Sequence, residues 1–258
     1  MSLLSALKRD AAVLGRLMYG MPAGSSHAER LQAFYAPQAD AYDAFRERLL
    51  SGRAELMRKL APPPGAYVVE LGAGTGRNLE FLGEAAARLD RIDLVDLCPS
   101  LLERARLRAA ARTNVRIVRE DATTYRPDRP ADCAYLSYSL TMMPDWRAVL
   151  ANAVAMLRPG GVLGVVDFQV TAEEGARAAL SRAFWRSWFA HDGVMLNPGH
   201  LQELRRTLPR HYAIELAAPV PYLPLLRVPY YIFVGRKPGR RITRSAYPAA
   251  RRRALQAA

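Results

Sequence analysis

A glycine-rich stretch directly after an apolar run has the spacing of a loop that could hold a nucleotide-like ligand. The apolar run ends at Glu70, and Gly72, Gly74 and Gly76 follow at every second position. Glycines let bare backbone approach a ligand closely, because no Cβ stands in the way. An amphipathic stretch over 79–89 comes next, so the pattern predicts a strand, a tight turn and a helix. The start of such a helix favours an anionic group.

The glycine spacing also separates classes of cofactor. Loops that bind nicotinamide or flavin cofactors follow G-x-G-x-x-G, whereas the sixth position here is Arg77. A carboxylate at the end of the second strand can accept both ribose hydroxyls. Asp96 ends the apolar run 91–96, twenty residues after Gly76. Asp93 is the alternative, but it lies in the middle of the predicted strand and not at its end, so we favour Asp96.

The order Glu-x-Gly-x-Gly-x-Gly resembles the first motif of class I S-adenosylmethionine-dependent methyltransferases. The resemblance implies that the loop surrounds the methionine part of S-adenosylmethionine, with Glu70 beneath it. It implies that an Asp-Ala pair after the third strand contacts the adenine amine. The cofactor-binding residues expected on this basis are Tyr42, Arg53, Glu70, Gly72, Ala73, Gly74, Gly76, Asn78, Asp96, Leu97, Asp121, Ala122 and Ser137.

The elements that must position these residues follow in the order of an α/β doubly wound, Rossmann-like domain. Further apolar runs predict strands over 114–119, 132–138, 162–168, 211–217 and 230–235. We therefore expect a mostly parallel, seven-stranded sheet, and the methyltransferase resemblance implies that its final strand runs antiparallel. Ligands of such sheets bind beyond the carboxyl ends of the strands.

Length and composition predict one compact domain with two appendages. The 258 residues are half hydrophobic, which is enough for a sizeable core. We expect a methyltransferase domain over 27–235, with the cofactor core at about 65–170 and a substrate cap formed by 27–60 and 171–208. An amphipathic N-terminal helix would occupy 1–26, and a basic tail 236–258. No apolar run is long enough to span a membrane.

The formal charge of +13 points to polyanionic partners, namely nucleic acid, an anionic membrane surface or acidic substrates. Every charged residue from 236 to 253 is Lys or Arg, although such a tail can also be solvated without any partner. Residues 1–26 suit a helix in a membrane interface and equally a helix packed on its own domain. The basic tail and the amphipathic N-terminal segment together predict a cytoplasmic protein bound peripherally to the inner membrane surface.

Cysteine and histidine usage excludes two other classes of site. Cys98 and Cys133 lie in or beside predicted strands, which predicts buried thiols instead of a disulfide scaffold. The four histidines are scattered, and none has metal-ligand spacing, so no metal is expected.

The segments that flank the core carry a narrower resemblance. Many small-molecule and lipid methyltransferases have Tyr-x-x-x-Ala-x-x-Tyr-Asp in a helix that closes over the cofactor, and Tyr35, Ala39, Tyr42 and Asp43 match it. Tyr35 and Tyr42 share a helix face, so a core-packing aromatic stripe is the alternative. Together with this motif, four segments make residues 27–237 similar to the diacylglyceryl-homoserine N-methyltransferases of betaine-lipid synthesis: 42–47, 139–146, 184–192 and 229–237.

This resemblance implies three successive methyl transfers to the homoserine amine of a membrane lipid, which yield diacylglyceryl-trimethylhomoserine. It implies a separate partner enzyme that transfers the aminocarboxypropyl group. The same pocket would serve phosphatidylethanolamine or a small soluble amine, which stay as alternatives. A nucleic-acid methyltransferase is less favoured, because Ser137-Tyr-Ser-Leu stands where base-modifying enzymes usually carry an Asn/Asp-Pro-Pro-aromatic motif.

Methyl transfer to an amine needs a deprotonated nucleophile aligned with the sulfonium methyl. A free alkyl ammonium has a pKa near ~10.4, so a base or a desolvated pocket helps. His191 is the predicted base, with Asp192 to orient it, although a surface pair is an equal alternative. Tyr138 and Tyr35 are the other catalytic candidates. Arg53 or Arg186 could clamp the substrate carboxylate. For Arg53 we favour a second role, in which it holds the cofactor's own carboxylate, because it lies near the closing helix. Aromatic faces can hold a methylated cation, and the candidates are Tyr35, Tyr138, Trp146, Trp185, Trp188 and Phe189.

Overall fold

The computed structural model describes residues 24, 26–36, 49–170, 175–190, 193–221 and 223–239. Its strands are β1 (Tyr67–Leu71), β2 (Arg91–Asp96), β3 (Val115–Arg119), β4 (Ala131–Ser137), β5 (Leu157–Phe168), β6 (His211–Val220) and β7 (Leu223–Arg236). Its α-helices are α2 (His27–Tyr35), α4 (Arg53–Leu60), α5 (Asn78–Leu82), α6 (Pro99–Ala109), α7 (Trp146–Met156), α8 (Ala176–Ala190) and α9 (Gly199–Thr207). Two 3₁₀ helices are η2 (Gly83–Arg88) and η3 (Leu140–Met142).

The strands form one seven-stranded sheet in the order β3-β2-β1-β4-β5-β7-β6. Strands β1 to β5 pair in parallel, whereas β7 runs antiparallel to both β5 and β6. The predicted α/β fold with an antiparallel final strand is therefore confirmed. The strand order reverses between β1 and β4, which is where open α/β sheets bind ligands.

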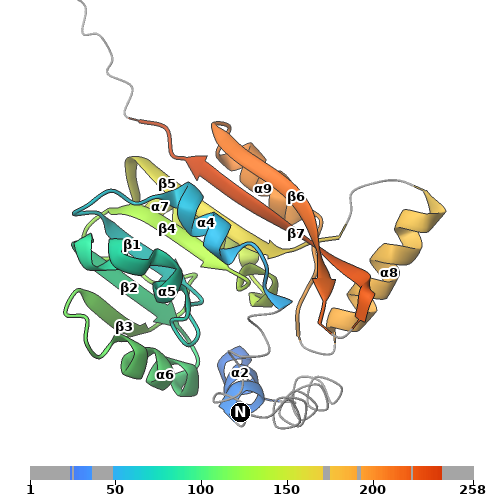
Figure 1. Cartoon of the computed structure of the whole chain (residues 1–258), viewed down its shortest axis with the longest axis horizontal. Helices are drawn as coiled ribbons and strands as arrows, with labels where there is room; N and C mark the ends of the chain where they lie inside the picture. The colour runs from blue at the N-terminus through green and yellow to red at the C-terminus, as the bar shows by residue number, and fades with distance from the viewer. Residues whose placement is uncertain are drawn as a thin grey trace, which may run out of the picture.

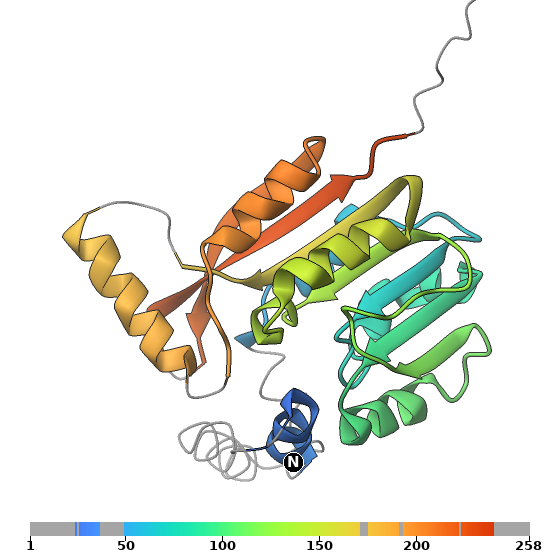
Figure 2. The ribbon, with the colours of Figure 1, turned by 180° about the vertical axis from the view of Figure 1, so that it is seen from behind.

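Helices cover both faces of the sheet (Figures 1 and 2). Helices α4, α5 and α6 pack on one face, and α7 and α9 pack on the other. The alternation of side chains along a strand separates the two layers, because successive Cβ atoms point to opposite faces. In β1, Val68 packs in the layer with α4, α5 and α6, whereas Val69 and Leu71 pack in the layer with α7 and α9.

Some elements differ in length from the sequence-based expectation. The helix expected over 79–89 ends at Leu82, and a 3₁₀ turn continues to Arg88. Gly83 has a φ of 55°, which breaks the α-helical path. The outer hairpin is also longer than expected, because β6 extends to Val220 and β7 begins at Leu223.

The segment between β5 and β6 forms two helices with different surroundings. Helix α9 packs on the sheet beside α7, through Leu201, Leu204 and Leu208. Helix α8 lies apart from the sheet at one end of the molecule, beside the start of β7 (Figures 1 and 2). Among the residues described, no helix is both long enough and apolar enough to cross a membrane.

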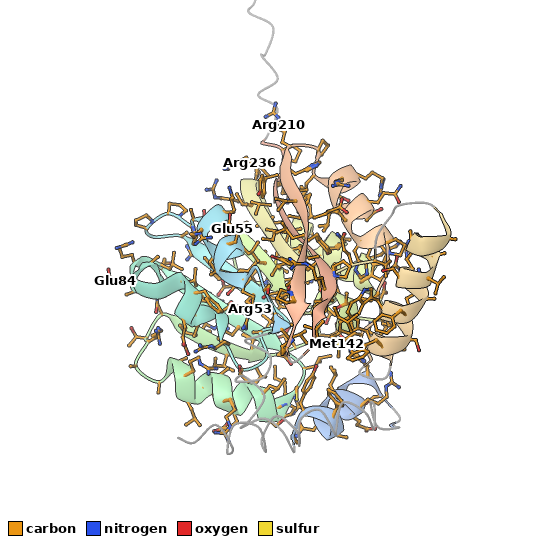
Figure 3. All side chains as sticks on the ribbon, turned by 45° about the vertical axis from the view of Figure 1, so that its right-hand side comes forward. Arg53, Glu55, Glu84, Met142, Arg210 and Arg236 are labelled. Carbon is orange, nitrogen blue, oxygen red and sulfur yellow. The ribbon has the colours of Figure 1, made fainter. Side chains whose placement is uncertain are left out.

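The two ends of the sheet differ in the side chains that they present (Figure 3). Arg210 and Arg236 lie together at one end, where the backbone N–H of Arg236 donates to the carbonyl of Arg210 at 3.0 Å. Met142 lies toward the opposite end, just beyond the carboxyl end of β4. This second end holds the cavity described next.

Candidate active site

A cavity of about 300 Å³ lies at the carboxyl ends of the parallel strands, where the strand order reverses. Its walls come from the glycine loop after β1, the end of β2, the turn after β3, the segment after β4 and helix α2. The lining residues are His27, Leu31, Tyr35, Gly72, Gly74, Val95, Asp96, Leu97, Leu101, Glu120, Asp121, Ala122, Thr123, Tyr138, Ser139, Met142, Met143, Pro144, Asp145 and Val149.

The glycine loop is shaped by backbone conformations that side chains rarely adopt. Gly72 and Gly74 have φ of 74° and 54°. A Cβ on Gly72 would lie 2.4 Å from the Cβ of Ser139, which leaves no room for a side chain. A Cβ on Gly74 would meet only the Leu101 side chain, at 3.9 Å. Since Gly74 lines the cavity, its missing side chain leaves open space for a ligand.

Asp96 faces the cavity from the end of β2. Its Oδ2 accepts a hydrogen bond from the N–H of Gly74, and its Oδ1 accepts one from the N–H of Cys98, both at 2.8 Å. Burial raises the pKa of Asp96, although these backbone N–H groups act in the opposite direction. Each oxygen keeps a second lone pair, so the carboxylate can accept two further hydrogen bonds from a diol.

Asp93, the alternative to Asp96, lies on the other side of β2. It is fully buried, and its Oδ2 accepts hydrogen bonds of 2.5 Å from the hydroxyls of Tyr67 and Tyr125. Arg91 also donates to this carboxylate. Asp93 does not line the cavity, so the structure brings only one of the two acids to the ligand site.

Glu70 lies beneath the glycine loop, where it is fully buried. It accepts hydrogen bonds from Asn78 Nδ2 at 2.6 Å and from the Tyr135 hydroxyl at 2.8 Å. Burial raises the pKa of Glu70 to about 7. Glu70 and Asn78 therefore support the loop from below, and neither side chain lines the cavity.

The turn after β3 forms a second polar wall. Asp121 and Ala122 both line the cavity. Asp121 Oδ1 accepts hydrogen bonds of 2.7 Å from the N–H and the hydroxyl of Thr123. The Ala122 carbonyl accepts a hydrogen bond of 2.8 Å from Asn152, which fixes this turn against α7.

The segment after β4 forms the remaining wall. Tyr138 has a φ of 54°, and its hydroxyl donates a 2.6 Å hydrogen bond to the Ser51 carbonyl. Burial raises the pKa of Tyr138 well above its usual range, so this phenol stays protonated and is a poor base. The ring lines the cavity and packs on Phe168, with ring centroids 4.6 Å apart.

A buried carboxylate holds this segment in place. Asp167 accepts hydrogen bonds from the N–H of Thr141 at 3.1 Å and from its hydroxyl at 2.7 Å. Burial raises the pKa of Asp167 to about 6. The Thr141 carbonyl in turn accepts a 2.7 Å hydrogen bond from the N–H of Met195. Asp167 therefore positions η3, whose Met142 lines the cavity.

Several expected site residues lie close to the cavity without lining it. Arg53 begins α4, is buried, and donates from Nε to the Leu50 carbonyl at 3.3 Å. Ser137 ends β4, and its buried Oγ has no hydrogen-bond partner among the described residues. The Cβ position of Gly76 faces Leu94, inside the core. Ala73 is also buried in the core. Of the expected cofactor residues, those in the lining are Gly72, Gly74, Asp96, Leu97, Asp121 and Ala122.

Most of the expected aromatic lining lies elsewhere. Trp146 packs on His200, with ring centroids 4.5 Å apart, and does not line this cavity. Trp185 and Phe189 are buried but do not line the cavity, and Trp188 is 42% exposed. Tyr35 and Tyr138 do line it. Tyr42, His191 and Asp192 lie outside the described residues.

The segment expected to cap the pocket lines none of this cavity within its described part. None of the described side chains of α8 and α9 lines the cavity, because α9 packs on the sheet beside α7 and α8 lies beyond Phe168. Conversely, His27, Leu31 and Thr123 line the cavity although no sequence motif predicted them as site residues. For Thr123, the available sequence signal was its position two residues after Asp121. Cys98 and Cys133 are buried free thiols, as expected.

The cavity is acidic. Four carboxylates line it, from Asp96, Glu120, Asp121 and Asp145. No lysine or arginine is found among the described residues that form its walls. Opposite charges within a few ångströms attract more strongly in a partly buried site than in bulk water. The cavity is therefore electrostatically suited to ligands that carry positive charge.

Comparisons with known proteins agree with this geometry. Residues 68–161 match the methyltransferase domain family. The chain is 28% identical over 180 residues to a trans-aconitate 2-methyltransferase of Methylobacterium radiotolerans, covering 69% of this chain and 66% of that protein. It is 32% identical over 112 residues to a trans-aconitate 2-methyltransferase of an Enterobacter species, covering 43% of each. The chain thus spans less than two thirds of the length of either relative.

A solved structure shares the fold. The Phospholethanolamine N-methyltransferase 2 of Haemonchus contortus, solved with phosphomonomethylethanolamine and S-adenosylhomocysteine, superposes with a TM-score of 0.64. The sequence identity is 13%, and the match covers 84% of this chain and 61% of that chain. At this identity the likeness extends to the fold alone.

Proposed function

We propose that this chain, which carries a class I S-adenosylmethionine-dependent methyltransferase domain, methylates the amine of a lipid headgroup. The expected substrate is diacylglyceryl-homoserine, and the expected product after three transfers is diacylglyceryl-trimethylhomoserine. Two observations support this proposal. The sequence segments that flank the core resemble the enzymes of this reaction, and the cavity chemistry suits an amine.

The acidic cavity is the observation that carries the proposal. An ammonium substrate and a sulfonium cofactor are both cationic, and four carboxylates without a lining lysine or arginine attract both. The same carboxylates would repel an acidic substrate such as the trans-aconitate named for the relatives. The single carboxylate of homoserine is compatible with this cavity only beside a cation, and the nearby buried Arg53 is the candidate.

The residues present fit S-adenosylmethionine, which supplies an electrophilic methyl group when bound. Asp96 is suited to the ribose hydroxyls, because two backbone N–H groups already orient its carboxylate. Asp121 and Ala122 are suited to the adenine ring, and the open space at Gly74 to the methionine part. The apolar side chains of Leu31, Leu101 and Met142 in the cavity wall would limit the contact of water with a bound cofactor.

The remaining task of the protein is to bind and orient the amine. Tyr138 is held rigidly by its hydrogen bond to Ser51 and by Phe168, so its ring offers a fixed face to a cation. Its high pKa means that it donates a hydrogen bond and does not remove the substrate proton. The amine must therefore lose its proton to solvent or to another group, and we expect kcat/KM to rise with pH between 7 and 9.

A radiolabelled transfer assay tests the proposal. Purified protein and S-adenosylmethionine labelled in its methyl group are incubated separately with diacylglyceryl-homoserine, phosphatidylethanolamine, free homoserine and bulk RNA. Label in diacylglyceryl-homoserine, in up to three chromatographic steps, is the expected result. The Asp96→Ala variant serves as the control for cofactor-dependent transfer.

The other arms identify the alternatives. Label in phosphatidylethanolamine alone would mean that the substrate is a lipid amine with a different headgroup. Label in homoserine alone would mean that the substrate is a soluble amine and not a lipid. Label in RNA alone would contradict the proposal. Binding of the cofactor without transfer to any lipid would also contradict it.

A further inference from the structure

Helix α8 carries an apolar stripe on the side that faces away from the domain. Leu180 is 74% exposed, and Phe184 and Trp188 are each 42% exposed. These residues are four apart along the chain, so they share one helix face. The opposite face, with Trp185 and Phe189, is buried. We call Leu180, Phe184 and Trp188 the α8 face.

The α8 face is connected to the cavity by a continuous series of aromatic rings. Tyr138 lines the cavity, and its ring centroid lies 4.6 Å from that of Phe168. Phe168 lies 4.6 Å from Phe189 on α8. The series continues along α8 through Trp185, 5.9 Å from Phe189, and ends at Phe184, 5.0 Å from Trp185.

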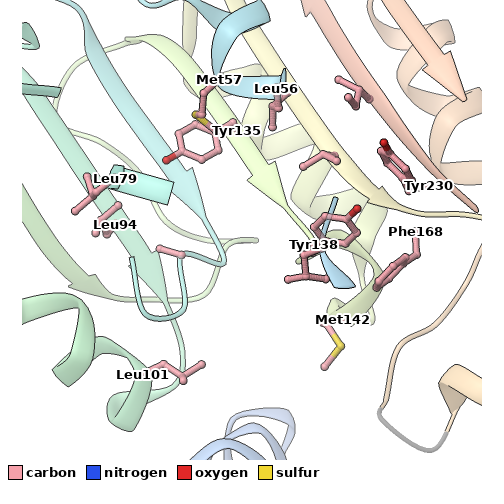
Figure 4. Close-up of a cluster of buried hydrophobic side chains, with 14 of the residues drawn as sticks. Leu56, Met57, Leu79, Leu94, Leu101, Tyr135, Tyr138, Met142, Phe168 and Tyr230 are labelled. Atoms are coloured by element: carbon pink, nitrogen blue, oxygen red, sulfur yellow. The ribbon is translucent and has the colours of Figure 1, made fainter. Parts of the chain in front are cut away.

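Figure 4 shows the inner end of this series, with Tyr138 and Phe168 close together above Met142. Trp188, on the exposed side, lies 6.3 Å from Trp185 and 5.7 Å from Phe184. A packed series of aromatic rings, most of them buried, therefore joins the wall of the cavity to α8. The outer end of this series is the α8 face.

We infer that the α8 face docks on an anionic lipid bilayer, which would place the domain at the surface that holds a lipid substrate. The sequence of α8 contains arginines and no acidic residue, and Arg186 is exposed. The whole chain carries a formal charge of +13. Helices that bind membrane interfaces combine bulky apolar residues with Lys or Arg in this way. Tryptophan favours the interface because its ring is amphipathic.

A second copy of the chain is a weaker occupant of this face. The three side chains expose on the order of 300 Å², estimated from typical side-chain areas. A stable protein interface needs about 800 Å² from each partner. Insertion into a bilayer needs no matching protein surface, because apolar burial alone contributes. This inference rests on the proposed function, since an enzyme with a lipid substrate must meet the membrane that holds it.

Tryptophan fluorescence tests the docking without any methyl transfer. The chain has three tryptophans, and Trp146 and Trp185 are only 6% and 5% exposed. A blue shift on adding vesicles therefore reports mainly on Trp188. We expect vesicles of phosphatidylglycerol and phosphatidylcholine to cause this shift in the full-length protein. Lipids brominated on the acyl chains should quench it, and Trp188→Phe should lose most of the shift and the quenching.

Vesicle sedimentation of variants supplies the second measurement. Phe184→Ser and Trp188→Ser should each weaken binding by about tenfold or more, because each removes a bulky apolar side chain from the bilayer. Leu107→Ser is the matched control, since Leu107 is 63% exposed on α6, away from α8. It should bind vesicles as the unmodified protein does. All variants should keep their affinity for S-adenosylhomocysteine, which confirms that they fold.

The outcomes separate this inference from the proposed function. Vesicle binding that is unchanged in Phe184→Ser and Trp188→Ser, with Trp188 not quenched, would overturn the docking of α8 even if lipid is methylated. The same result with dimers that dissociate in these variants would assign the face to a second copy. Quenching of Trp188 without label in diacylglyceryl-homoserine would support the docking and reject the substrate.

Discussion

The carboxylate of Asp96 accepts a 2.8 Å hydrogen bond from the backbone N–H of Gly74, which joins the end of β2 to the glycine loop after β1. The two residues are 22 positions apart in the chain. The bond orients the carboxylate at the cavity while it holds the loop in its left-handed conformation. This one hydrogen bond therefore orients the acceptor for the ribose hydroxyls and also keeps the backbone of the glycine loop accessible to the cofactor.

Replacing Asp96 should weaken cofactor binding severely. Hydrogen bonds to a charged group contribute about 1.5–3 kcal/mol each, so losing two to the ribose should lower affinity by 10²-fold or more. Isothermal titration of Asp96→Ala with S-adenosylhomocysteine measures this. Asp90→Ala is the control, because Asp90 forms an exposed ion pair with Arg129 outside the cavity. Unchanged affinity in Asp96→Ala would reject the ribose assignment.

Gly74→Ala should lower cofactor affinity through the space that its methyl group occupies. The added Cβ enters the cavity, with only Leu101 at 3.9 Å. Gly65→Ala is matched for backbone strain, since Gly65 has a φ of 76° and no atom within 4 Å of its Cβ position. Both variants should lose about 1 kcal/mol of stability. If titration with S-adenosylhomocysteine gave both variants equal affinity, the cavity around Gly74 would not be the cofactor site.

Glu70 should make the free energy of unfolding depend on pH. Burial raises its folded-state pKa from 4.5 to about 7, so the protonated form is favoured in the folded protein. Its contribution is fully present below pH 4.5 and is lost as pH rises through 7. The loss approaches about 3 kcal/mol by pH 8.

Urea unfolding at several pH values measures this contribution. Glu70→Gln should reduce the dependence between pH 5 and 8, because the amide does not titrate, while Asp167, whose pKa burial raises to about 6, should retain part of it. Glu84→Gln, at an exposed position in η2, should leave the dependence unchanged. A slope in Glu70→Gln equal to that of the unmodified protein would place the responsible group elsewhere.

Tyr138→Phe should separate a structural role of the hydroxyl from a catalytic one. The hydroxyl donates to the Ser51 carbonyl, so its loss should cost about 1 kcal/mol of stability. Since the phenol stays protonated, the pH dependence of kcat/KM should keep its shape while cofactor affinity stays unchanged. A loss of the rise of kcat/KM between pH 7 and 9 in this variant would show that Tyr138 takes the substrate proton.

The core of the fold and part of the site could be predicted because their determinants are local. Apolar runs ending in acids predicted strands that are observed, among them the run that ends at Asp96. The helix after the glycine loop was predicted too long, because the effect of Gly83 on backbone conformation is not evident from apolar spacing. Trp146 was expected at the cavity because its neighbours Pro144 and Asp145 line it, but its own ring packs on His200.

The sequence by itself determined the strand–loop–helix order, the glycines at alternate positions and the acids at strand ends, because these depend on steric limits and periodicity within a few residues. Only the tertiary structure decided which acid faces the cavity, since Asp93 and Asp96 differ by the direction of their side chains from one strand. It also decided that Asp167 supports η3 and that aromatic rings connect Tyr138 with α8. Such contacts join residues far apart in the chain, and packing selects them, not local propensity.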